Sequence, residues 1–80
     1  MIPTIDMQRT GTRIKELRKR KGMPVAELTE NLGLCCNNSV YKWQSGQALP
    51  TLDNLVILGA LFGVSIDEII VIRKVEERNG

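Results

Sequence analysis

Asn37, Asn38 and Ser39 stand directly ahead of a short amphipathic segment and could recognise a partner through hydrogen bonds. Val40 and Trp43 follow at a spacing of three, which is typical of the buried face of a helix. A helix whose buried face is anchored in this way exposes its first turn to solvent. An asparagine amide can bond adenine N6 and N7 bidentately, and a serine hydroxyl serves several bases. The pattern therefore predicts a helix tip that reads base edges in the DNA major groove.

Tyr41 and Lys42 lie one turn further along and are expected to touch base edges or phosphates. The expected base contacts are Asn37, Asn38, Ser39, Tyr41 and Lys42. Asn37 has a competing role, because asparagine is a favoured N-cap whose side chain would then bond to the backbone. For the other positions the alternative is an ordinary solvated surface residue. Trp43 is expected in the core, where it packs this helix against the first one.

The segment from Arg9 to Lys21 carries seven basic residues and one acidic residue, Glu16, although the net charge of the whole chain is only +2. A charge run of this kind is commonly a solvated helix face. The alternative is a patch that contacts DNA phosphates. On that interpretation the phosphate contacts are Arg9, Arg13, Arg18 and Lys19.

The composition is that of one small globular domain. The chain has 80 residues, of which 42% are hydrophobic, and it has no histidine. We expect no enzyme activity, cofactor, metal site or small-molecule ligand, because paired inward carboxylates and a Gly-rich phosphate loop are both missing from the sequence. No leader and no long apolar run is visible, so we expect a soluble, cytoplasmic protein.

Apolar periodicity and capping residues predict five helices. They cover about residues 10–21, 24–32, 37–45 and 52–62, with a short fifth helix from Ile66. Gly33 supplies the left-handed conformation for a tight turn between the second and third helices. Thr51 is expected to cap the fourth helix, and Ser65 with Glu68 to form a capping box for the fifth. Gly59, inside the fourth helix, predicts a packing constraint, such as the close approach of another helix.

The chain ends differ from this helical body, which spans 10–70. Residues 1–9 show no helical period and form an N-terminal arm, while residues 71–80 form a tail. The β-branched run from Ile69 to Ile72 favours a strand over a helix. We therefore expect an extended segment from about Ile70 to Val75 that pairs with the arm or with a second copy of the chain. The last residues, 76–80, are expected to fray.

Cys35 and Cys36 are neighbours, so they cannot staple distant parts of the chain, and two thiols without histidine make no structural zinc site. A thiol near the start of a helix could act as a redox or metal trigger beside the residues that read bases. The alternative is that Cys35 is a small buried filler and Cys36 a poor helix cap.

Three segments carry a resemblance to a known family: TRIKELRKRKGM, AELTENLGL and VYKWQSGQALPTLDNLVILGALFGVSIDEII. From about Thr10 to Ile70 the chain resembles the phage-repressor and Cro family of helix-turn-helix domains, often called XRE. The resemblance implies a compact, all-α, five-helix domain of the lambda-repressor type, with the extended chain ends as candidates for short terminal β-strands. It also implies that Asn37, Asn38 and Ser39 occupy the base-reading positions of the family.

The sequence departs from the family pattern at several positions. Gln44 stands where relatives often have a glutamate that pairs with the residue at Arg18, to which a glutamine can still hydrogen-bond. Pro24 and Val25 replace a Thr-Gln pair whose glutamine contacts a phosphate in relatives. The turn is also one residue longer than its commonest form, at Cys35 or Cys36.

These observations predict a sequence-specific DNA-binding transcriptional regulator, which we expect to be a repressor, with its third helix in the major groove. We expect a homodimer on double-stranded DNA, with the two recognition helices ~34 Å apart. The alternative is a protein-interaction module, such as an antitoxin or a partner-binding helix-turn-helix, whose basic face is incidental. A steep salt dependence of binding distinguishes the DNA-binding regulator from the protein-interaction module, because phosphate contacts release counterions from DNA.

Overall fold

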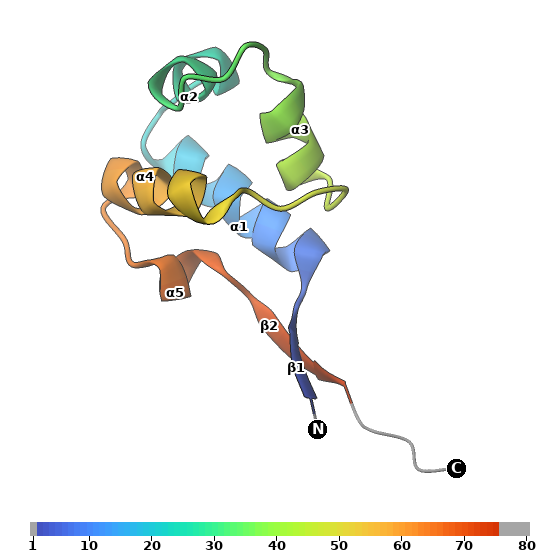
Figure 1. Cartoon of the computed structure of the whole chain (residues 1–80). Coiled ribbons are helices and arrows are strands. Elements are labelled where there is room, and N and C mark those ends of the chain that lie inside the picture. The colour runs from blue at the N-terminus through green and yellow to red at the C-terminus, as the bar shows by residue number, and fades with distance from the viewer. Residues whose placement is uncertain (1, 76–80) are drawn as a thin grey trace.

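The computed structural model describes residues 2–75, which form a helical body and a two-stranded ribbon that projects from it (Figure 1). The elements are β1 (Ile2–Ile5), α1 (Met7–Arg20), α2 (Val25–Asn31), α3 (Asn38–Gln44), α4 (Leu52–Phe62), α5 (Ile66–Ile69) and β2 (Ile72–Val75). The prediction of five helices with short terminal strands is confirmed. The chain runs along α1, turns back through α2 and α3, and covers α1 again with α4 and α5 (Figure 1).

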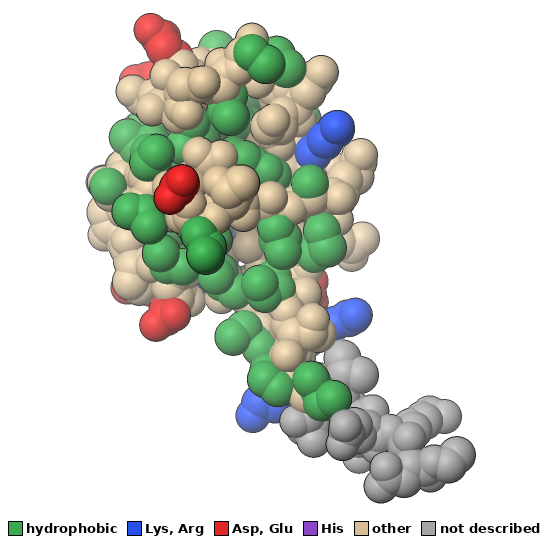
Figure 2. Space-filling view, in the orientation of Figure 1, with side chains coloured by type: hydrophobic (Ala, Val, Ile, Leu, Met, Phe, Trp, Pro, Cys, Tyr) green, Lys and Arg blue, Asp and Glu red, His purple; other side chains and the backbone are tan. Residues whose placement is uncertain are grey.

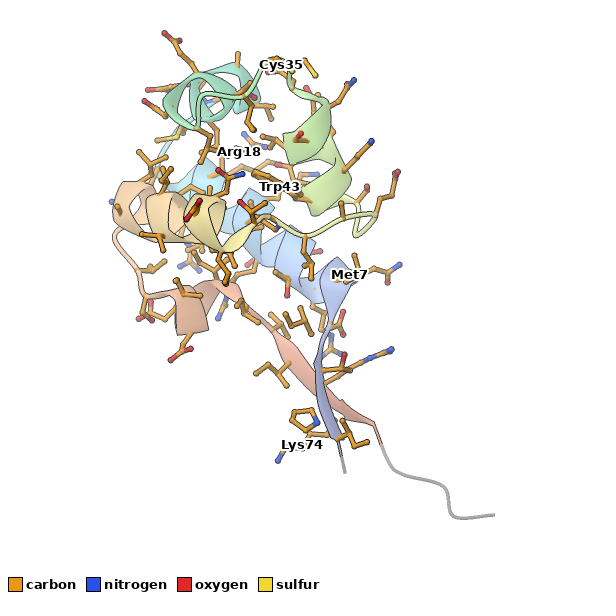
Figure 3. All side chains as sticks on the ribbon, in the orientation of Figure 1. Met7, Arg18, Cys35, Trp43 and Lys74 are labelled. Carbon is orange, nitrogen blue, oxygen red and sulfur yellow. The ribbon has the colours of Figure 1, made fainter. Side chains whose placement is uncertain are left out.

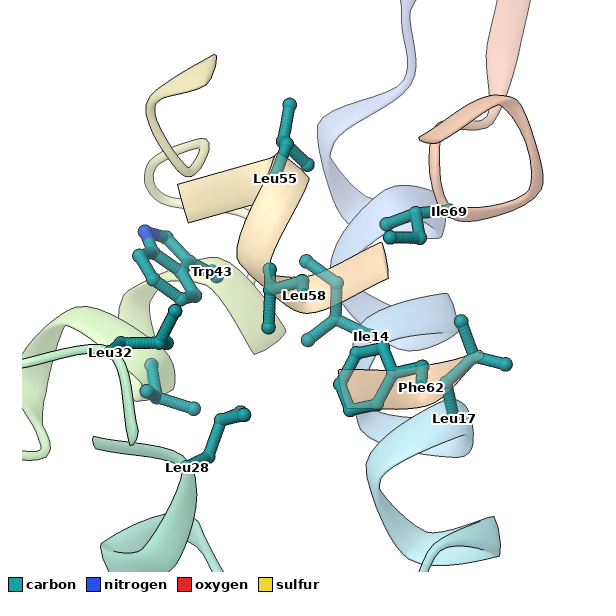
Figure 4. Close-up of a cluster of buried hydrophobic side chains, with 10 residues drawn as sticks. Ile14, Leu17, Leu28, Leu32, Trp43, Leu55, Leu58, Phe62 and Ile69 are labelled. Atoms are coloured by element: carbon teal, nitrogen blue, oxygen red, sulfur yellow. The ribbon is translucent and has the colours of Figure 1, made fainter. Parts of the chain in front are cut away.

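A single hydrophobic core holds these helices together (Figure 4). Its members are Ile14, Leu17, Leu28, Leu32, Val40, Trp43, Leu55, Leu58, Phe62 and Ile69. Ile14, Leu28 and Leu58 lose all of their solvent exposure, and burial of an aliphatic side chain of this size contributes about 1.5–3 kcal/mol. Trp43 keeps only 4% of its exposure. Its predicted place in the core is confirmed.

α1 and α3 approach each other closely at Gly11, where the two helices cross. A Cβ added to Gly11 would overlap the carbonyl oxygen of Trp43 and would lie 3.0 Å from the carbonyl oxygen of Gln44. A second contact lies nearby, because a Cβ on Gly46 would come within 2.8 Å of the Gln8 side chain. The absence of side chains at these two positions lets the backbone of α3 and of its following turn lie directly on α1.

Side-chain N-caps stabilise the starts of two helices, α1 and α4. α1 begins at Met7, earlier than the predicted start at Thr10, because Asp6 acts as its N-cap and accepts the Arg9 backbone N–H at 2.9 Å. The prediction for α4 is confirmed, since the hydroxyl oxygen of Thr51 accepts the Asn54 N–H at 3.2 Å.

The predicted capping box is wrong, whereas the packing constraint predicted at Gly59 is present. Ser65 is the N-cap of α5, but its side chain makes no capping bond, and the Glu68 N–H donates to the Ser65 backbone carbonyl at 3.1 Å instead. This backbone bond satisfies the N–H that the Ser65 hydroxyl would accept in a capping box. At Gly59 an added Cβ would meet the Val64 carbonyl oxygen at 2.9 Å, so the close neighbour is the turn that follows α4 and not another helix.

The two chain ends pair as an antiparallel ribbon, as predicted for the arm and the β-branched run. The register places Ile2 opposite Val75 and Ile5 opposite Ile72. The ladder continues into the helical body, where the Asp6 N–H donates to the Val71 carbonyl at 2.8 Å. There the Val71 N–H donates at 3.0 Å to the hydroxyl oxygen of Thr10, a fully buried side chain of α1.

Within residues 2–75 no helix is long and apolar enough to cross a membrane. The same stretch holds no group of three His, Cys, Asp or Glu side chains placed to bind a metal ion. The expected fraying of residues 76–80 lies outside the described residues.

Candidate nucleic-acid interface

α3 presents one polar stripe to solvent. Val40 and Trp43 are buried, and a helix turns by about 100° per residue, so the opposite side is formed by the remaining positions of the helix and its C-cap. The stripe consists of Asn38, Tyr41, Lys42 and Ser45. Tyr41 keeps 53% of its exposure although it is aromatic. Three of the five expected base contacts therefore lie side by side on the outward face.

A shallow hollow of about 540 Å³ joins this stripe to α1. Lys15, Gln44 and Gln47 complete its lining, and no acidic side chain belongs to the lining among the described residues. Lys15 was not among the expected contacts. Residues four apart share a helix face and Gly11 faces α3, so Lys15 lies on the side of α1 that is turned toward α3. The hollow is thus a basic and hydrogen-bonding surface shared by two helices.

Asn37 and Ser39 lie on the two flanks of this stripe and are half-buried. Asn37 occupies the N-cap position of α3, but its side chain makes no capping hydrogen bond. Its backbone has φ −77° and ψ −8°, in the helical region, whereas capping side chains bond back from an extended residue. The capping role that competed with base contact is therefore not formed, and the Asn37 amide stays available.

Arg18 links α1 to Gln44 of α3, one of the residues that line the hollow (Figure 3). Its Nε donates to Gln44 Oε1 at 2.9 Å, which confirms the hydrogen bond expected for this pair. Its Nη1 donates to the Met23 carbonyl at 3.0 Å. The half-buried guanidinium is thereby hydrogen-bonded within the protein, and its role as a phosphate contact stays a prediction.

Arg9 and Arg13 lie on the far side of α1. At about 100° per residue both are turned away from Gly11, the residue that faces α3. Arg13 Nε donates to the Glu68 carbonyl at 2.8 Å, and Arg9 Nε lies 3.8 Å from Asp6 Oδ2 in an exposed ion pair. The structure therefore separates these two expected phosphate contacts from the polar stripe.

Lys19, the remaining expected phosphate contact, is exposed. At about 100° per residue it is turned about 80° from Gly11, nearer to the α3 side of α1 than Arg9 and Arg13 are. It follows Lys15 by four residues, so the two ammonium groups occupy adjacent turns of one face. The basic residues of this segment are therefore divided between two sides of α1. Lys15 and Lys19 lie nearer to α3, whereas Arg18 is hydrogen-bonded within the protein and Arg9 and Arg13 lie on the far side.

Cys35 and Cys36 lie in the turn between α2 and α3, where Figure 3 labels Cys35. Both are free and exposed. The interpretation of Cys35 as a small buried filler is wrong. The turn is shaped by Gly33, which has φ +68° as predicted, and by the Leu34 N–H, which donates to the Thr29 carbonyl at 3.0 Å. The thiols therefore contribute little to packing at the start of the recognition helix.

Comparisons with known proteins agree with this geometry. A family model described as helix-turn-helix matches residues 14–69. The uncharacterized HTH-type transcriptional regulator YobD of Bacillus subtilis (strain 168) is 33% identical over 72 residues, which cover 84% of this chain and 63% of YobD. The HTH-type transcriptional activator BcrR of Enterococcus faecalis is 29% identical over 58 residues, which cover 72% of this chain and 28% of BcrR. The chain thus spans less than two thirds of the length of both curated relatives.

Among solved structures, the restriction-modification controller protein C.AhdI from Aeromonas hydrophila superposes with a TM-score of 0.71. The match covers 80% of this chain and 96% of C.AhdI at 28% sequence identity. The likeness extends over nearly the whole of that protein. The turn between α2 and α3 lies within the residues that the family model matches.

Proposed function

This chain belongs to the helix-turn-helix family, and from that premise we propose that it is a sequence-specific DNA-binding transcriptional regulator. α3 lies in the major groove of double-stranded DNA, with its first turn toward the base edges. The relatives named as transcriptional regulators support this assignment, and so does the solved controller protein.

The observation that carries the proposal is the outward stripe of α3 beside the hollow. Asn38 reads a base edge through its amide, which can donate and accept at once. Tyr41 and Lys42 lie on the same face one turn later and contact bases or the adjacent backbone. Asn37 and Ser39 are secondary contacts at the edges of the stripe, since both are half-buried.

Lys15 and Lys19 supply the phosphate contacts from α1. Lys15 already lines the hollow with Asn38 and Lys42, so a DNA strand laid on α3 passes over its ammonium group. Ammonium groups bind phosphates without fixed geometry and add affinity that does not depend on sequence. Arg18 acts indirectly, because it holds Gln44 and thereby the orientation of α3.

Two copies bind a pseudo-palindromic site. A single recognition helix of two turns contacts only a few base pairs, so specificity requires a second half-site about 34 Å away, one helical turn of DNA. The regulator acts in the cytoplasm without catalysis of its own, and it represses when its site overlaps a promoter.

The test is a selection of bound sequences from a random DNA pool, followed by binding of the selected duplex at several salt concentrations. We expect an inverted repeat and an affinity that falls steeply with salt, by roughly one log-log slope unit per phosphate contact. Recovery of no enriched sequence, together with no band shift at low salt, would refute DNA binding. That result would favour the protein-interaction module instead.

A further inference from the structure

The ribbon of β1 and β2 leaves apolar side chains in solvent. Ile2, Ile5 and Ile72 keep 52%, 37% and 60% of their exposure. Figure 2 shows hydrophobic side chains continuing from the helical body along this ribbon. A two-stranded ribbon alone is marginally stable, and exposed isoleucines on it are a sign of a missing neighbour.

The two edges of the ribbon differ in their free backbone groups. The Asp6 N–H donates inward to Val71, and hydrogen-bonded pairs alternate along an antiparallel ladder. With the observed register, Pro3 and Ile5 direct their backbone groups outward on β1, and Ile72 and Lys74 do so on β2. Proline has no N–H, so the edge of β1 lacks a donor and is protected against another strand. The edge of β2 keeps both of its donors.

We propose that a second copy of this chain pairs antiparallel along the open edge of β2, giving a four-stranded sheet in the order β1–β2–β2–β1. The inference rests on the proposed dimer and assigns its interface. A two-fold axis brings identical strands together in antiparallel order, so the same edge of both copies is used.

The charges on β2 select one register. If Arg73 stood on the two-fold axis, the two guanidinium groups would face each other across the strands, which is unfavourable. With Ile72 on the axis, Arg73 lies opposite Val71 of the second copy and Lys74 opposite Ile70. The paired Ile72 residues then exchange their N–H and C=O groups, and each Lys74 N–H reaches an Ile70 carbonyl.

The same register joins two of the three exposed isoleucines, Ile5 and Ile72, into one row. They are directly opposite on the ribbon, so their side chains lie on the same face. Pairing through Ile72 extends this face across the axis as Ile5, Ile72, Ile72 and Ile5. Each Ile72 side chain thereby gains a cross-strand apolar neighbour from the second copy.

A competing surface exists on α4, where Leu52 and Val56 keep 77% and 59% of their exposure. These side chains project from a helix whose backbone N–H and C=O groups are already paired within it. The edge of β2 offers both apolar area and free backbone N–H and C=O groups, and it allows a register in which like charges do not face each other. The α4 surface is therefore the alternative that the experiment must separate.

The main test is sedimentation equilibrium of the full chain and of Lys74→Pro. Proline at this position removes an outward donor and leaves the inward ladder to β1 intact, so the circular dichroism spectrum and the unfolding midpoint should stay close to those of the parent. We expect the dimer dissociation constant to rise at least about tenfold, since two intermolecular hydrogen bonds are lost per dimer. The matched variant Leu52→Glu should leave that constant unchanged. A parent chain that stays monomeric, or dissociation caused by Leu52→Glu and not by Lys74→Pro, overturns the proposal.

Crosslinking gives a measurement that does not depend on Lys74→Pro. In a Cys35→Ser/Cys36→Ser background, Ile72→Cys should form a disulfide-linked dimer under mild oxidation, because opposed residues of a hydrogen-bonded pair lie about 5.5 Å apart at Cα. Leu52→Cys in the same background should form no disulfide-linked dimer, and the reverse pattern refutes the β2 interface. Binding of monomeric Lys74→Pro to a half-site duplex tests the DNA-binding proposal separately, because it uses α3 alone.

Discussion

The Cα of Gly11 lies against the carbonyl oxygen of Trp43, so closely that no side chain fits at residue 11. This contact fixes the depth at which α3 sits on α1. Arg18 then fixes its rotation by the hydrogen bond to Gln44 at 2.9 Å. The absence of a side chain at Gly11 and the hydrogen bond between Arg18 and Gln44 thus set the orientation of the polar stripe.

Gly11→Ala should therefore destabilise the protein even though alanine favours helix. The substitution gains about 1 kcal/mol in helix propensity, but overpacking against the α3 backbone should outweigh it and lower the free energy of unfolding by about 2 kcal/mol net. Urea denaturation measures the difference. Glu16→Ala, on an exposed position of the same helix, is the control and should change stability by less than about 0.5 kcal/mol. An unfolding free energy for Gly11→Ala above that of the parent would contradict the close crossing.

Thr10 and Thr29 form a natural matched pair of buried hydroxyls. Thr10 Oγ1 accepts the Val71 N–H at 3.0 Å, whereas Thr29 Oγ1 has no hydrogen-bond partner in the described structure. Thr10→Val should cost about 2 kcal/mol because it leaves a backbone N–H unpaired, while Thr29→Val should be neutral or stabilising by about 1 kcal/mol. Thermal unfolding of both variants checks this. Equal losses would show that the Thr10 bond does not hold β2 on α1.

Gln44→Glu should strengthen the attachment of α3. A carboxylate accepts the Arg18 Nε–H in a charge-assisted bond, worth about 0.5–1 kcal/mol more than the amide. A double-mutant cycle with Arg18→Met isolates this term, since the gain must vanish when the guanidinium is absent. A gain that persists in the Arg18→Met background would assign the effect to another neighbour.

Lys15→Ala should reduce both DNA affinity and its salt dependence. Loss of one phosphate contact lowers the slope of the log-log salt plot by about one unit. Arg20→Ala is the matched control, because it removes the same charge from an exposed position on the opposite side of α1. Fluorescence anisotropy at a series of salt concentrations measures both. Equal slopes for the two variants would mean that the field of the whole helix acts, and not a contact at Lys15.

Asn38→Ala and Lys42→Ala should change DNA binding in different ways, the first at one base position and the second on all sequences. We expect Asn38→Ala to cost about 1–3 kcal/mol on the selected sequence and to relax preference at one base position. Lys42→Ala should weaken all sequences alike if Lys42 contacts a phosphate. Binding to a panel of single-base variants distinguishes the two. A uniform loss for Asn38→Ala would remove it from the base-reading set.

The sequence sufficed for the elements that depend on local chemistry. Apolar spacing located the five helices, Thr51 marked the start of α4, and the β-branched run from Ile69 to Ile72 marked the change from helix to strand. Each of these signals acts within one or two turns. The pairing of Arg18 with Gln44 was also foreseen, but through the family resemblance and not through spacing.

The features that the sequence could not supply depend on contacts distant in sequence. Arg9 and Arg13 stay predicted phosphate contacts by charge, and only the direction in which α1 presents Gly11 to α3 shows that they lie away from the stripe. The place of Lys15 in the lining of the hollow follows from the same helix crossing. The register with β2 is needed to infer that Pro3 leaves the outer edge of β1 without a backbone N–H donor.

The pairing of Ile2 with Val75 joins the two residues that are furthest apart among the described part of the chain. During synthesis β1 leaves the ribosome first, yet it has no partner until β2 has been translated. Closing so long a loop is also the costliest step in chain entropy. The ribbon should thus be the last element to fold and the first to exchange its amide protons, on a core of helices that is already formed.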